Sequence, residues 1–152
     1  MDPKSKQILM VVAFFAIAAA LYFGYKGFSK QYTVDPKKIF TDNFNEDVDM
    51  VQDLKGGGNI SGNYDVWIHF KLDHRAKIKG TKEFDESPAD LVVAQEWFAK
   101  NTPYAEDPSL SIQQRRFLKV YNHLTSTDTQ LEHDWLLHNW RTNDHYFRAW
   151  GY

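Results

Sequence analysis

The sequence predicts an α+β protein in which one N-terminal transmembrane helix precedes a small domain, with a short antiparallel sheet packed on about two helices. Three patterns predict it: an uncharged apolar run over residues 8–25, strict alternation over 64–72, and apolar side chains at helical spacing over 87–101. The chain has 152 residues, enough for one modest domain. We therefore expect a membrane anchor over residues 1–25, a juxtamembrane linker over 26–45 and the α+β domain over 46–152.

The N-terminal apolar segment is long enough to cross a bilayer. Residues 8–23 read ILMVVAFFAIAAALYF, and with its flanks this helix covers the roughly 30 Å of hydrocarbon. Two tyrosines lie at one end as interfacial aromatic side chains, and lysines bracket the segment. The lipid bilayer is thus the expected partner of residues 8–25. A signal peptide cleaved after Ala20 is the alternative, because alanines 18–20 offer an A-x-A site.

The orientation of this segment does not follow from the positive-inside rule, because lysines flank both of its ends. Lys4 and Lys6 before the apolar run are typical of an export signal. From that signal-like start we expect a single-pass membrane protein whose C-terminal domain is extracytoplasmic.

The composition excludes several classes of function. Residues 27–152 hold 15 basic and 19 acidic side chains, so nucleic acid is not an expected partner, because binding by counterion release needs a basic surface. The chain has no cysteine, which excludes disulfides, thiolate zinc sites and thiol catalysis.

The next segments are a linker and a turn. Residues 26–45 are polar with scattered aromatic side chains, and a short helical turn can follow Asp35, where Pro36 suits the first helical position. The triple glycine 56–58, with asparagines beside it, predicts a turn or flexible loop over residues 55–63.

Residues 64–72 carry the clearest strand pattern. Alternate apolar side chains from Tyr64 onward fall on one face of the strand, and Asp65, Trp67 and His69 fall on the other. A strand with one apolar face favours an antiparallel sheet whose second face is solvated.

Two helices are expected after this strand. The first opens at Ser87 and Pro88 and ends at Asn101, before a proline. The second begins near Ser111 and has its apolar side chains on one stripe. That stripe comprises Phe117, Val120, Tyr121 and Leu124.

The C-terminal stretch admits two interpretations. Thr127 and Gln130 form a possible capping box for a helix that extends through His138. Alternatively, residues 141–144 form a hairpin loop before a final strand in which Tyr146, Arg148, Trp150 and Tyr152 alternate. We prefer the hairpin, because aromatic residues favour strands and the loop residues favour turns.

Aromatic side chains are the candidates for a functional surface. Exposed tryptophans are informative, since large apolar patches are uncommon on isolated monomers. The alternatives are that these rings fill the core of the domain, or that they stack against a small ligand. The candidate residues are Trp67, His69, Trp135, Trp140, Tyr146 and Trp150.

No catalytic residue, metal site or cofactor is assigned from the sequence. Three imidazoles could converge if the last strand pairs near His69, but the histidines lack the spacing of a helical HExxH site or of two ligands on one strand face. No Gly-flanked serine matches a nucleophile elbow.

These patterns lead to two hypotheses about function. The first is a non-catalytic envelope protein that docks to a partner protein or membrane complex through its aromatic surface. The alternative is an exported module that binds a glycan or a metal. A concave pocket holding two or more of the candidate rings favours the ligand hypothesis, and a flat or convex aromatic face favours docking.

Overall fold

A computed structural model describes residues 34–60, 63–79, 84–126 and 131–151. The chain divides into two compact units, 1–33 and 34–152, and the fold below is that of the second unit. The expected anchor over residues 8–25 and the alternative cleavage after Ala20 lie outside the described residues. Among the residues that are described, no helix has the length and apolar character needed to span a membrane.

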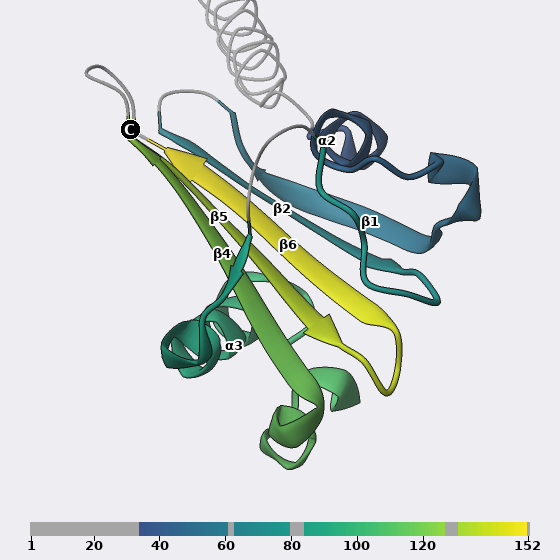
Figure 1. The fold of residues 1–152 in the computed structure, drawn as a ribbon, viewed down its shortest axis with the longest axis vertical. Helices are drawn as coiled ribbons and strands as arrows, with labels where there is room; N and C mark the ends of the chain where they lie inside the picture. The colour runs from purple at the N-terminus through teal and green to yellow at the C-terminus, as the bar shows by residue number, and fades with distance from the viewer. Residues whose placement is uncertain (1–33, 61–62, 80–83, 127–130, 152) are drawn as a thin grey trace, which may run out of the picture. The chain divides into compact units, whose positions relative to one another are not determined.

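The unit is built on a six-stranded antiparallel sheet with the order β1-β2-β6-β5-β4-β3 (Figure 1). A small α+β domain with an antiparallel sheet and about two helices is thus confirmed. The α-helices and strands are α2 (Pro36–Asn43), β1 (Gln52–Asn59), β2 (Tyr64–Lys71), β3 (Asp85–Glu86), α3 (Leu91–Asn101), β4 (Leu118–Ser126), β5 (Leu131–Asn139) and β6 (Asp144–Gly151). Short 3₁₀ helices are η1 (Val48–Met50), η2 (Pro88–Asp90), η3 (Pro108–Leu110) and η4 (Ile112–Phe117).

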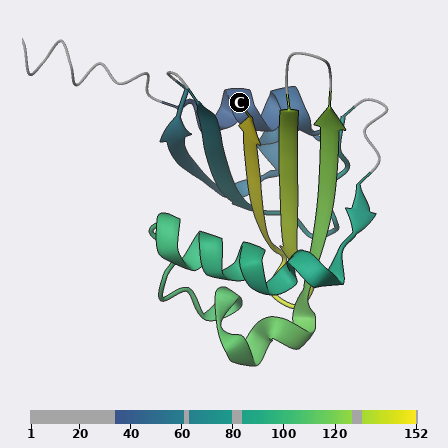
Figure 2. The same cartoon turned by 90° about the vertical axis from the view of Figure 1, so that its left-hand side faces the viewer.

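The two faces of the sheet are covered by different helices, α2 on one side and α3 on the other (Figures 1 and 2). The alternation in β2 is confirmed, because Val66, Ile68 and Phe70 pack in the core beneath α2. The opposite face was expected to be solvated, yet Trp67 packs against the core beneath α3 and His69 is buried. Both faces are covered because α3 and the segment after it cross the second one.

Residues 34–45 belong to the compact unit, although the sequence places them in the linker. Asp35 caps α2 by accepting a hydrogen bond from the backbone N–H of Lys37. The helix buries Phe40, and Phe44 follows it into the same core. The Phe44 ring centroid lies 5.2 Å from that of Phe70 in β2. This aromatic packing fixes the start of the domain before residue 46.

The triple glycine lies inside strand β1, so the loop expected over residues 55–63 is wrong for its first half. A Cβ added at Gly57 would lie 2.9 Å from Cζ2 of Trp67, and one at Gly56 would lie 2.8 Å from Cγ2 of Ile68. Gly58 has a φ of 127°, a backbone conformation that favours glycine. The glycines therefore let β1 approach the bulky side chains of β2.

The helix expected from Ser111 is also wrong. Residues 112–117 form only η4, and the chain then continues as strand β4. Leu118 and Val120 lie in the core beneath α3 while Tyr121 lies in the core beneath α2, which is the alternation of a strand. The stripe has helical spacing, but both faces of the sheet are covered, so its members can be divided between two apolar faces of a strand. Nine-residue pairing with β5 decides in favour of the strand.

The C-terminal hairpin is confirmed. The chain turns after Asn139, whose side-chain oxygen accepts hydrogen bonds from the backbone N–H groups of Arg141 and Thr142. Asn143 has a φ of 62°, in the left-handed region that asparagine tolerates. The alternative helix through His138 is excluded, because residues 131–139 form β5.

Candidate functional site

The structure brings five of the six candidate residues onto the α3-facing side of the sheet. Trp67 in β2 and Trp135 in β5 both pair with Arg148 of β6, which lies between them. His69 pairs with Tyr146 two residues away along the same strands. The five candidate residues on this face are Trp67, His69, Trp135, Tyr146 and Trp150.

Arg148 occupies the centre of this aromatic face, and the sequence-based reasoning missed its role. Its guanidinium carbon lies 3.8 Å from the ring centroid of Trp97, 4.1 Å from that of Trp150 and 5.6 Å from that of Trp135. Its Nε and Nη2 donate to the two carboxylate oxygens of Asp65 at 2.9 and 2.8 Å. These contacts combine cation–π attraction with a bidentate ion pair. The Arg148 side chain itself therefore covers part of the ring surface on the aromatic face.

His69 is one of two candidates that are buried, and it belongs to a polar cluster under the segment after α3. Its Nε2–H donates to Oδ1 of Asp144 at 2.8 Å, and the Tyr104 ring lies 4.4 Å from its own. Burial raises the pKa of Asp144, but the hydrogen bonds from His69 and Thr142 outweigh burial, and the pKa lies below its ordinary value. Burial raises the pKa of Tyr104 to about 12.

Tyr146 is the second buried candidate. It is fully buried, and its hydroxyl forms a hydrogen bond of 2.5 Å with that of Ser109. Burial raises the pKa of Tyr146 above its ordinary value. Both residues are buried, so they contribute to the packing of the domain, and neither lines any of the three hollows described below.

The histidines do not converge on one site. His69 and His133 face α3, whereas His138 and His145, which pair with each other across β5 and β6, face α2. This division follows from the alternation of side chains along each strand. In the described ranges, no group of three potential metal-binding side chains is present.

A hollow of about 330 Å³ opens beside the aromatic face, and we call it the tryptophan pocket. Leu124, which lines this pocket, is 59% exposed. Asn122 Nδ2 donates to Asp90 Oδ2 at 2.6 Å, which ties β4 to the start of α3. The lining residues are Asp90, Asn122, His123, Leu124, His133, Trp135 and Trp150. The pocket is concave and contains two of the candidate rings.

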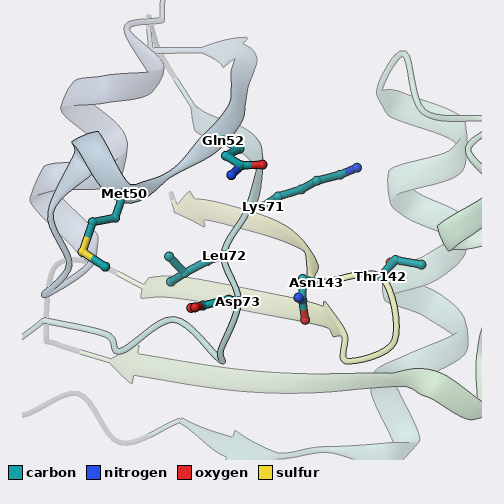
Figure 3. Close-up of a pocket in the computed structure, with 7 residues that line it drawn as sticks. All are labelled: Met50, Gln52, Lys71, Leu72, Asp73, Thr142 and Asn143. Atoms are coloured by element: carbon teal, nitrogen blue, oxygen red, sulfur yellow. The ribbon is translucent and has the colours of Figure 1, made fainter.

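A second hollow, of about 250 Å³, lies where β1, the end of β2 and the β5–β6 turn meet (Figure 3). Its only ammonium group is that of Lys71, which lies 3.9 Å from carboxylate oxygens of both Asp53 and Asp144. Two carboxylates therefore lie near this ammonium group, and their charge disfavours an anion in the hollow. A third hollow, of about 230 Å³, opens beside Arg75 and Tyr121.

Trp140 is the sixth candidate; it lies apart from the others in the β5–β6 turn and is 51% exposed. Its ring contacts Phe117 edge-on at 5.0 Å between centroids.

Comparison with protein-family models, with curated proteins and with solved structures finds no match to this chain. The proposal about function therefore rests on the fold and the tryptophan pocket alone.

Proposed function

We propose that this protein is a non-catalytic docking protein of the cell envelope, held at the membrane by residues 8–25, which binds a partner protein through the tryptophan pocket. The observation that carries the proposal is a hollow lined by Trp135 and Trp150 with the exposed Leu124 at the same site. Tryptophans in pockets that exclude water are typical energetic centres of protein–protein interfaces.

Concavity alone favours a ligand at this pocket, but the exposed apolar side chains around it favour a protein partner. Val93 of α3 is 56% exposed and lies one helical turn after Asp90, which lines the pocket. Leu124 is similarly exposed, so apolar side chains stand on both elements that flank the hollow. A volume of about 330 Å³ accepts one large side chain, and the apolar surroundings extend the contact beyond a single small ligand.

A charge placed on Leu124 tests this proposal. We expect Leu124→Asp to abolish co-purification of the bound partner from detergent-solubilised membranes, with the affinity tag placed after Tyr152. The carboxylate would have to be desolvated against the apolar part of the partner. The fold should be retained, because the Leu124 side chain is mostly exposed.

Met50→Asp is the matched control, since Met50 is 60% exposed and lines the hollow of Figure 3 instead. The control should keep the partner, and the thermal unfolding midpoint of each variant shows whether the fold is intact. A folded Leu124→Asp protein that retains the same partner would contradict docking at this pocket.

A small-ligand module is the second candidate, and the concavity of the pocket favours it. Asn122 and Asp90 place an amide and a carboxylate beside two indole rings, a combination that suits the hydroxyls and the apolar face of a sugar. Saturation-transfer NMR of the full chain with a panel of oligosaccharides tests it. If an oligosaccharide binds to the natural chain and Asn122→Ala abolishes that binding, the result would favour the glycan hypothesis over docking.

A further inference from the structure

A second exposed cluster lies at the end of the sheet where β5 turns into β6. The pairing of Leu118 with Asn139, and of Asn139 with Asp144, brings the end of η4 beside this turn. The backbone N–H of Trp140 donates to the carbonyl oxygen of Phe117 at 3.1 Å. We call this cluster the aromatic-cationic end; Arg116, Trp140 and Arg141 contact Phe117, and the exposed Ile112 at the start of η4 is counted with them.

The two arginines of this end are ordered by the same ring. The guanidinium carbons of Arg116 and Arg141 lie 4.6 and 4.7 Å from the ring centroid of Phe117. Both side chains are exposed, and within the described part of the chain neither forms an ion pair with a carboxylate. The end therefore presents two positive charges in fixed positions on a chain whose net charge is −2.

Apolar side chains accompany these charges. Ile112 is 73% exposed and Trp140 is 51% exposed, which are high values for residues of this size. An indole combines an apolar body with one N–H group, so it is well suited to the boundary between water and hydrocarbon. Exposed apolar residues beside arginines are the composition by which peripheral proteins bind membrane surfaces.

The chemistry of this end fits the phosphate groups of lipids. Guanidinium groups form bidentate hydrogen bonds with phosphate oxygens. The exposed Trp140 and Ile112 suit the boundary between headgroups and hydrocarbon. From charge and composition together, we propose that the aromatic-cationic end binds the anionic headgroup surface of a lipid bilayer. This contact is independent of the tryptophan pocket.

Vesicle capture by the full chain tests this proposal. The protein is reconstituted into phosphatidylcholine vesicles, and fluorescent acceptor vesicles are added that contain either phosphatidylcholine alone or about one-third phosphatidylserine. Protein that does not incorporate is instead sedimented directly with each acceptor. We expect capture of the anionic acceptors only, and about a fivefold loss of affinity for each arginine that is neutralised.

The test variant is Arg116→Gln/Arg141→Gln, and its charge-matched control is Lys37→Gln/Lys100→Gln, which neutralises exposed lysines on α2 and α3. The arginine variant should lose most of its capture of anionic vesicles, and the lysine variant should keep it. The two variants should have the same thermal unfolding midpoint. Equal capture of both acceptors by the natural chain, or unchanged capture by the folded arginine variant, would overturn the proposal. Arginine-dependent binding of poly-L-glutamate without vesicle capture would also overturn it, in favour of an acidic protein segment.

Discussion

Acidification from pH 6.5 to pH 4 is expected to destabilise the domain by several kcal/mol, through two stacked histidines beneath α2. His138 and His145 have ring centroids 4.1 Å apart, and both are buried. Burial lowers the pKa of His138 to about 4, with smaller contributions from Arg75 and His74. Burial likewise lowers the pKa of His145 to about 3.

The direction of the effect follows from the protons bound by each state. Below pH 6.5 the unfolded chain protonates both histidines, whereas the folded domain keeps them neutral until the pH approaches their lowered pKa values. The unfolded state therefore binds more protons in this window, and stability falls as the pH falls. At about 1.4 kcal/mol per pKa unit, each histidine costs on the order of 3 kcal/mol at pH 4.

The hydrogen bonds of His145 maintain the neutral ring. Its Nδ1–H donates to the carbonyl oxygen of Asn143 at 3.0 Å, and its Nε2 accepts from the backbone N–H of Ala76 at 3.3 Å. Protonation of Nε2 would remove the acceptor and bury a charge. His138 is the better residue to replace, because its Nε2 forms no hydrogen bond within the described part of the chain.

His138→Phe should roughly halve the loss of stability between pH 6.5 and pH 4, measured as the free energy of unfolding in urea at each pH. His74→Gln is the control, because His74 is exposed, its pKa is raised by hydrogen bonds to Asp73 and Glu46, and its charge is only a minor cause of the lowered pKa values of His138 and His145. A raised pKa adds stability at low pH, so His74→Gln should not reduce the loss of stability between pH 6.5 and pH 4. If the natural domain is equally stable at both pH values, His138 and His145 do not make it sensitive to acid as we expect.

Short-range sequence patterns predicted the strands and the helix whose structure depends mainly on residues close together in the chain. The alternation of β2 is visible in the sequence because Val66, Ile68 and Phe70 share one apolar face, and β6 is visible from its aromatic residues after a turn. The helix expected over residues 87–101 is confirmed as α3 from Leu91 to Asn101, whereas Ser87 and Pro88 open η2 just before it. Strand β1 was missed because its glycines are required by the side chains of β2 above them, a contact between different segments.

The sequence predicted which aromatic residues gather at the candidate site, but not which of them are exposed. The strand pattern placed Trp67 and His69 on one face, but it could not show that α3 and Tyr104 would cover that face. Arg148 was missed although it alternates with Tyr146 and Trp150, because its partner Asp65 lies 83 residues away in the sequence. Such pairing depends on the order of strands in the sheet, which local periodicity does not encode.

Arg148→Met should destabilise the domain by about 2 to 4 kcal/mol, because removal of one partner leaves the other charge and its surroundings uncompensated. Methionine fills much of the same volume but offers no charge to the tryptophan rings and no hydrogen bond to Asp65. We expect the lower part of this range, since the Asp65 side chain is 39% exposed and water can hydrate its carboxylate. Urea unfolding at neutral pH, with near-ultraviolet circular dichroism of the tryptophans, measures both effects.

A double-mutant cycle with Asp65→Asn separates the ion pair from the ring contacts. If the pair dominates, the double variant should cost little more than Arg148→Met; if ring stacking dominates, the two costs should add. Lys119→Met is the control, because the Lys119–Glu86 pair is exposed on both sides and should contribute much less. An Arg148→Met protein as stable as this control would mean that the tryptophans hold their positions without Arg148. The measurement therefore decides how far the tryptophan pocket, which Trp135 and Trp150 line, depends on Arg148 for its shape.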